Sequence, residues 1–226
     1  MQTFATATIL VALGAFSAWA GKDEDDRLKE ATATLSEMAG AGDKGIPTDL
    51  MNKAVCAVVV PGVKKAGFIV GAKYGRGFAS CRDGKGGWSA PAAMRIEGGS
   101  FGLQAGGAES DVIVLVMNKR GMEKLLQDKF TLGGEGTAAI GPVGRDAEAM
   151  TDAQMHAEML SWSRSRGAFA GISLQGATLR QDDDANKGLY GKASDNKSIL
   201  SGGATAPASA APFLAELKKF SPKKKS

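Results

Sequence analysis

Histidine and cysteine are nearly absent from this sequence of 226 residues, which contains one histidine and two cysteines. These side chains are common transition-metal ligands and catalytic groups, so their scarcity leaves little room for a metal centre or a cysteine nucleophile. His156 has Glu158 nearby in the sequence, but no serine lies in a nucleophile-elbow motif. A hydrolase built around His156 is therefore the weakest function that we consider.

Phosphate-binding loop motifs are missing as well. The glycine-rich segment 98–107 lacks the G-x-G-x-x-G spacing, and no segment matches G-x-x-x-x-G-K-[S/T]. We therefore predict no catalytic residue and no cofactor, and we expect no nucleic-acid partner.

Three polar residues near the C-terminal end resemble the start of a calcium loop. Asp182, Asp184 and Asn186 alternate as the first ligands of such a loop do, but Lys187 stands where glycine is needed and Ala193 where glutamate is needed. Helix capping is the favoured interpretation. A weak cation site is the alternative, and we predict no established metal site.

Glycine is abundant, with 31 residues spread among apolar segments. It is densest over residues 86–107, where it indicates tight turns and close backbone packing. The segment 111–117, DVIVLVM, follows and is typical of a strand buried on both faces. We predict an α+β fold with a glycine-rich, mainly antiparallel β-sheet core and a few short helices.

Local patterns place further elements along the chain. We expect a short helix capped by Thr48, a strand CAVVV that ends at Pro61, a helix starting near Asn118, and a hairpin that bends at Gly167. Period-two patterning predicts two strands over 63–82, followed by a turn at 83–86. A strand end and a helix capped by aspartate are expected over 180–191.

The N-terminal 20 residues are predicted to be a secretory signal peptide. Residues 3–18 are uncharged and mostly apolar, and Ala18-Trp19-Ala20 fits the small-residue cleavage pattern, so the mature chain should begin near Gly21. A retained N-terminal anchor is the alternative. Export predicts a periplasmic or outer-envelope location.

Residues 21–45 follow as an amphipathic helix, with Leu28 and Leu35 on its apolar stripe.

Two further expectations concern the cysteines and the C-terminal end. In an exported protein Cys56 and Cys81 could form a disulfide, and two buried free thiols are an equally weighted alternative. Residues 202–226 are rich in alanine, proline and serine and then in lysine, which indicates a linker and a basic tail.

Charge is distributed unevenly. Residues 21–50 contain four basic and eight acidic residues, whereas residues 61–100 contain seven basic and two acidic residues. The basic segment favours an anionic partner. Solvated side chains scattered over both faces of a sheet are the competing explanation.

An ordered set of motifs covers most of the chain from about Ile46 to Gly191. The motifs are IPTDL, KKAGFIVGAKYGRG, GGWSAPA, GGSFGLQAG, DVIVLVMN, KFTLG, AAIGPVGR, SRSRGAFAGISLQGATLRQDDDAN and LYG. As a set they resemble the SYLF lipid-binding domain family, which includes the yeast actin-binding domain and its Src-homology-3-linked animal relatives. The expected SYLF-like domain spans residues 46–201.

The resemblance implies binding of anionic phospholipids, phosphoinositides especially, with actin regulation in fungal members and no enzymatic activity. The export signal looks like a bacterial exported branch of the family. The anions that a bacterial envelope offers are phosphatidylglycerol, cardiolipin and lipid A phosphates.

We therefore predict non-catalytic, peripheral binding of anionic phospholipid at a membrane surface. A structural or protein-partner-binding envelope protein is the alternative, with an unknown partner. The predicted lipid-binding residues are Lys64, Lys65, Lys73, Arg76, Arg82 and Lys85, and Arg95 adds to the charge of the same segment.

Overall fold

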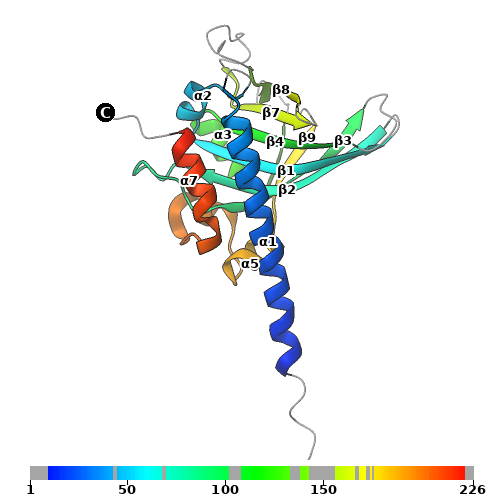
Figure 1. The fold of residues 1–226 in the computed structure, drawn as a ribbon, viewed down its shortest axis with the longest axis vertical. Helices are drawn as coiled ribbons and strands as arrows, with labels where there is room; N and C mark the ends of the chain where they lie inside the picture. The colour runs from blue at the N-terminus through cyan, green and yellow to red at the C-terminus, as the bar shows by residue number, and fades with distance from the viewer. Residues whose placement is uncertain are drawn as a thin grey trace, which may run out of the picture.

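A computed structural model describes residues 10–42, 45–67, 70–101, 108–132, 138–142, 156–165, 168–171, 174 and 176–221 (Figure 1). The strands are β1 Cys56–Gly67, β2 Val70–Cys81, β3 Ala92–Phe101, β4 Ala108–Val116, β5 Lys129–Thr131, β6 Ala138–Ile140, β7 Met159–Ser165, β8 Ala168–Gly171 and β9 Ala177–Gln181. The helices are α1 Leu10–Ala39, α2 Thr48–Lys53, α3 Lys119–Leu125, α5 Asp183–Tyr190, α6 Asn196–Ser198 and α7 Ala211–Phe220, with shorter turns η3 Ile199–Gly203 and η4 Ala208–Ala210.

The strands form a single sheet in the order β5-β9-β3-β2-β1-β4-β7-β6, and β8 pairs with β7. Among the described strands, only β6 and β7 pair in parallel. The predicted α+β class with a mainly antiparallel sheet is therefore confirmed. Strand β4 covers the predicted buried segment, and its last five residues are buried.

Hydrophobic cores lie on both faces of the sheet. On the face covered by α1 and α7, Leu28 and Leu35 pack with Phe78 and Trp162 (Figure 1). We call this side the helix-covered face. Side chains that alternate with these along the strands belong to a second core on the opposite face, which includes Val58, Met94, Val114, Leu179 and Ile199. Burial on both faces explains the long apolar runs in β1 and β4.

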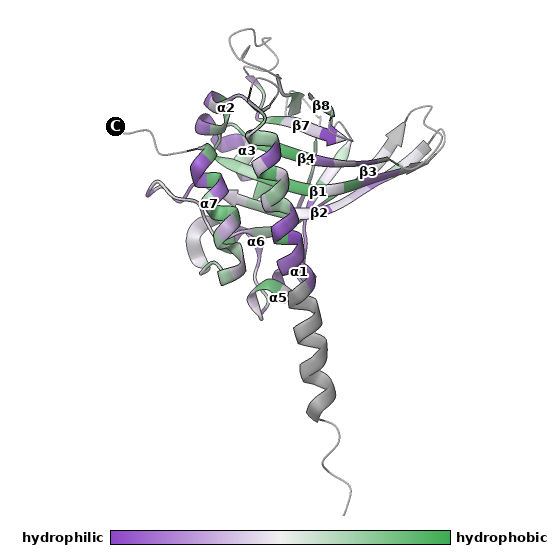
Figure 2. Ribbon diagram, in the orientation of Figure 1, coloured by the Kyte–Doolittle hydropathy of each residue, from purple (hydrophilic) through white to green (hydrophobic). Residues whose placement is uncertain are grey.

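The outer parts of β1, β2 and β3 extend beyond the helices as a projecting arm (Figure 1). We define the arm as residues 63–67, 70–77 and 95–101. Figure 2 shows the strands green where α1 covers them and mainly white or purple along the arm. On the arm, Lys64 and Tyr74 are exposed, whereas Val63 and Lys73 are buried.

Strand β1 does not end at Pro61, as the sequence predicts, but continues to Gly67. The pairing of β1 with β4 shifts register between Val60 and Val63, which marks a β-bulge. Gly62 has a φ of 56°, and its N–H donates to Asp111 Oδ1 at 3.0 Å. A bulge tolerates proline because the ladder hydrogen bond is already interrupted there.

The expected helices form with altered boundaries. Helix α1 begins at Leu10, earlier than the expected residue 21, and ends at Ala39, before the expected residue 45. Thr48 is the first residue of α2 rather than its cap, and Pro47 takes the N-cap position without a side-chain bond. At α3 the prediction is confirmed, because Asn118 accepts a hydrogen bond from the N–H of Gly121.

Two predictions concern the second half of the chain. Strands β7 and β8 pair antiparallel, as expected of a hairpin, while its predicted bend at Gly167 lies outside the described residues. The segment expected to be a linker and tail contains helix α7, whose Phe213 and Leu217 are fully buried. An amphipathic helix can bury these side chains against α1, and this packing gives the segment an ordered place in the fold.

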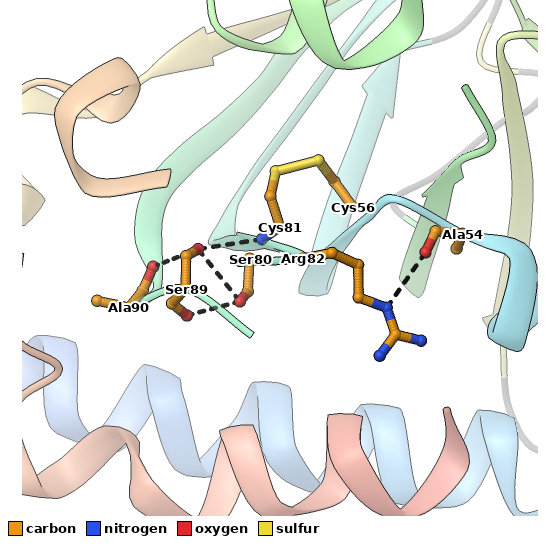
Figure 3. The surroundings of a disulfide bond; sticks show 7 residues. All are labelled: Ala54, Cys56, Ser80, Cys81, Arg82, Ser89 and Ala90. Atoms are coloured by element: carbon orange, nitrogen blue, oxygen red, sulfur yellow. Dashed lines mark hydrogen bonds between the residues drawn. A yellow bond between two sulfur atoms is a disulfide. The ribbon is translucent and has the colours of Figure 1, made fainter. Parts of the chain in front are cut away.

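Cys56 and Cys81 form a disulfide between β1 and β2 (Figure 3). The two residues face each other in the strand register, which brings the thiols together. Beside them, Ser89 Oγ accepts a hydrogen bond from the N–H of Cys81 at 3.1 Å. Of the two interpretations of the cysteine pair, the structure shows the bonded one.

The start of α5 joins three parts of the fold. Asp182 caps the helix by accepting a hydrogen bond from Ala185 N at 3.4 Å, and its other oxygen accepts from Arg76 Nε at 2.6 Å. Arg76 also pairs with Glu24 of α1 at 3.3 Å. Burial opposes the charge of Arg76, but the Asp182 hydrogen bond and both carboxylates hold its pKa above the usual value. Arg76 therefore locks α1 and α5 onto β2.

The calcium-loop resemblance is explained by this junction. Asn186 is buried, and its Oδ1 accepts a hydrogen bond from Ala93 N at 2.8 Å, while Asp184 is exposed in the first turn of α5. Within the described residues, no group of three or more histidine, cysteine, aspartate or glutamate side chains could hold a metal ion. Helix capping is confirmed, with Asp182 as the capping residue.

Removal of the disulfide should lower the free energy of unfolding. A variant with both Cys56→Ser and Cys81→Ser is expected to lose about 3 kcal/mol, because a bond across a 25-residue separation restricts the unfolded chain. Urea unfolding of the oxidised protein and the variant measures this difference. Equal unfolding midpoints, or two titratable thiols in the denatured, unreduced protein, would contradict the prediction.

Aspartates 182 and 184 provide a matched pair for testing the α5 junction. Asp182→Ala should lower the free energy of unfolding by about 3 kcal/mol, because it removes a helix cap and a partly buried charge partner. Asp184→Ala should change it by less than about 0.5 kcal/mol, as for other exposed sites. Chemical denaturation compares the two variants, and similar losses in both would contradict the assignment of Asp182 as the cap.

Candidate functional site

The six predicted lipid-binding residues lie in three separate places. Lys64, Lys65 and Lys73 are on the arm, and Arg76 is at the α5 junction. Arg82 and Lys85 follow the other end of β2. Arg82 is nine positions after Lys73, a distance of about 30 Å along an extended chain. The six side chains therefore do not form one patch.

Arg82 holds the C-terminal helix in place. Its guanidinium lies 4.3 Å from the centroid of the Trp88 ring and donates a hydrogen bond to Ser221 O at 2.9 Å, directly after α7. Burial lowers the pKa of Arg82. The sequence could not indicate this role, because Ser221 is 139 residues away along the chain.

Lys85 lies in the predicted turn, which Asp83 organises. Asp83 Oδ1 accepts hydrogen bonds from the N–H groups of Lys85 and Gly87, each at 2.8 Å. These bonds, with that of Gly87 the strongest, lower the pKa of the Asp83 carboxyl. Lys85 is exposed, but it lies at the end of β2 away from the arm.

Strand pairing gathers a row of basic residues that the sequence does not reveal. Arg76 of β2 pairs in register with Arg95 of β3, Arg95 with Arg180 of β9, and Arg180 with Lys129 of β5. Directly opposed residues point to the same side of a sheet, and Arg76 contacts α1 through Glu24, so the row lies on the helix-covered face.

The next row on this face adds an aromatic side chain. Tyr74 lies opposite Lys64 on β1 and opposite Glu97 on β3. Tyr74 is one of two exposed large hydrophobic residues in the described chain, with 46% of its surface accessible. We define the basic face as Lys64, Tyr74, Arg95, Arg180 and Lys129.

Carboxylates compensate only part of this charge. Glu97 pairs with Arg95 at 3.0 Å and with Arg180 at 3.3 Å, and Glu109 of β4 lies opposite Lys64. The basic face thus has four cations against these two carboxylates. The Arg180 side chain remains 42% exposed, and Lys64 and Lys129 are exposed. The resulting surface suits weak electrostatic attraction to an anionic layer.

Lys65 and Lys73 face the other way. They lie opposite each other on β1 and β2. Each is two residues from a position on the face of the second core, Val63 in β1 and Gly75 in β2. Lys73 is only 6% exposed and has no hydrogen bond or ion pair to another described residue. Burial, followed by the neighbouring charge of Lys65, lowers the pKa of Lys73. The arm lysines are therefore divided between two faces.

Glu158, the acidic residue near His156 in the sequence, belongs to an ion pair with helix α3. Glu158 lies 2.6 Å from Lys124 Nζ, so its charge is already balanced by an ion pair. Within the described residues, no helix has both the length and the apolar content required to cross a bilayer.

Comparison with protein families matches residues 97–220, more than half of the chain, to the Ysc84 family, described as "Las17-binding protein actin regulator". This segment includes the second half of β3, all of β9 and helix α5.

Individual relatives extend the similarity. SH3 domain-containing YSC84-like protein 1 of Bos taurus is 36% identical over 182 residues, 80% of this chain and 53% of that protein. An SH3 domain-containing protein of Schizosaccharomyces pombe is 36% identical over 171 residues, 74% of this chain and 40% of that protein. Protein YSC84 of Saccharomyces cerevisiae is 31% identical over 175 residues, 76% of this chain and 37% of that protein.

The chain thus spans about half the length, or less, of the relatives that it matches. The family resemblance predicted from the sequence motifs is confirmed. The Ysc84 family, which contains the SYLF domain, is a lipid- and actin-binding family of generally non-catalytic domains, and this chain belongs to it.

Proposed function

We propose that this chain binds anionic phospholipid without catalysis and that the basic face makes the membrane contact. The observation that carries the proposal is the in-register row of basic residues across β3, β9 and β5, beside an exposed tyrosine on the arm. Each basic group near an anionic surface contributes about 1 kcal/mol, so three or four such groups give reversible binding.

The geometry of the face suits a lipid surface. Neighbouring strands are about 4.8 Å apart, so a row across four strands spans about 15 Å, the width of a few lipid headgroups. Tyr74 adds an amphipathic ring of the kind enriched at membrane interfaces. Lys73 has no part in this surface contact, because it is buried on the opposite side of the sheet.

We further propose that the protein acts after export, in the periplasm or at the outer-envelope surface. The predicted signal peptide over residues 1–20 supports this location. The Cys56–Cys81 disulfide adds support, because such bonds persist mainly in oxidising compartments. Phosphatidylglycerol, cardiolipin or lipid A phosphates would then be the anionic ligands, in place of the phosphoinositides suggested by the family.

Charge reversal on the basic face tests the proposal. A variant with Lys64→Glu and Lys129→Glu should bind phosphatidylglycerol vesicles more than tenfold more weakly, because it removes two positive charges from the anionic surface and adds two negative ones. Wild-type binding should also weaken as salt shortens the screening length from about 10 Å at 0.1 M to about 3 Å at 1 M. Vesicle flotation measures both effects.

A matched control carries Lys53→Glu and Lys85→Glu, which make the same charge change at the end of the β1–β2 pair away from the arm. This control should float like the wild type. The tail lysines 223–225 are changed to glutamine in all proteins, because truncation before α7 would remove Phe213 and Leu217 from the core. Equal flotation of both double variants, or equal wild-type binding to neutral vesicles, would contradict the proposal and favour a protein-partner interface.

A further inference from the structure

Lys65 and Lys73 are two cations that lie directly opposite each other on β1 and β2. Lysine is rarely this buried without a partner, and an unpaired buried charge is costly. Lys73 is 6% exposed, and no described carboxylate or hydrogen-bond acceptor contacts its ammonium group. Its cross-strand neighbour on β1 is another cation, which adds repulsion instead of compensation.

The strands on either side offer no compensating charge. Gly98 of β3 lies opposite Lys73, and Ala108 of β4 lies opposite Lys65. The nearest acidic residues of β4, Glu109 and Asp111, alternate with Ala108 and therefore point to the helix-covered face. Glu97 of β3 is directed to that face as well, where it pairs with Arg95.

We propose that Lys65 and Lys73 form a binding site for a phosphate dianion, either the phosphomonoester headgroup of a lipid or a soluble phosphate. Two adjacent ammonium groups match a double negative charge, and lysine binds phosphate as a point charge with three donors. A bound dianion would replace repulsion between the lysines by attraction to both. This site is on the opposite side of the sheet from the basic face and does not depend on it.

Lysine can reach such a ligand although most of its surface is buried. A lysine side chain can pack its aliphatic stem against apolar neighbours and keep its ammonium group at the edge of a core. The pair occupies the outer part of β1 and β2, beyond the buried Val63. A phosphate group could therefore approach from the arm without opening the second core.

Thermal unfolding in sodium phosphate tests the site without any membrane. At pH 8, a phosphate concentration of about 100 times the dissociation constant should raise the Tm of the wild type by about 5 °C or more. The reference is sodium chloride of equal ionic strength. Lys73→Met and Lys65→Met should each remove most of this shift. Lys64→Met, on the same strand but the other face, should retain it. Equal phosphate shifts in all the proteins, or no shift in the wild type, would overturn the proposal.

A second readout distinguishes a ligand site from a structural lysine. Burial and Lys65 lower the pKa of Lys73 in the folded protein, so the unfolded chain binds more protons between the folded and unfolded pKa values. Without phosphate, the charge on Lys73 therefore lowers the free energy of unfolding at low pH. This penalty is relieved as pH rises from the folded-state pKa of Lys73 toward the usual lysine pKa. Lys73→Met should be at least as stable as the wild type at pH 7 and should lack this pH-dependent contribution. A large loss of stability in Lys73→Met would contradict the proposal.

Vesicles identify the source of the phosphate. If the ligand is a lipid, the wild type should bind vesicles containing phosphatidic acid, a phosphomonoester, more tightly than vesicles of equal charge containing phosphatidylglycerol, and Lys73→Met should lose this preference. If the ligand is soluble, Lys73→Met should lose the phosphate shift and bind both kinds of vesicle as the wild type does. Because the phosphate assay contains no lipid, its result is independent of the basic-face experiment.

Discussion

Antiparallel pairing of β1 with β2 is the constraint on which the rest of the structure depends. The pairing joins Cys56 to Cys81 at the inner end and, after a register shift between Val59 and Lys64, sets Lys65 opposite Lys73 at the outer end. The bulge after Val60 lies between these ends. Because strand side chains alternate, a one-residue slip would send each side chain to the other face. The disulfide, the bulge and the two hydrophobic cores all act against such a slip.

This register divides the basic charge of residues 61–100 into groups with different roles. Arg76 and Arg82 stabilise the fold by holding α1, α5 and the end of α7 against the sheet. The basic face collects cations from β1, β3, β9 and β5, whereas the Lys65–Lys73 pair lies on the opposite side. Uneven charge in the sequence favours an anionic partner, but strand pairing decides which side chains can act together.

Local patterns predicted the elements that depend on local chemistry. The apolar run of β4, the helix start near Asn118 and the aspartate-capped helix after β9 were all evident from nearby residues. The sequence did not reveal the role of Arg76, whose partner Asp182 is 106 residues away, or the alignment of Lys129 and Arg180 with the arm. Continuation of β1 past Pro61 also depends on a distant residue, Asp111, which accepts the N–H of Gly62.

The two tyrosines of this chain offer a direct test of membrane contact through the basic face. Tyr74 is exposed on that face, whereas Tyr190 is half-buried and donates a hydrogen bond to Pro91 O at 2.6 Å. In fluorotyrosine-labelled protein bound to anionic bicelles, a lipid with a paramagnetic headgroup should attenuate the fluorine NMR signal of Tyr74 much more than that of Tyr190, relative to a diamagnetic control. Equal attenuation of both signals, or stronger attenuation of Tyr190, would contradict this account.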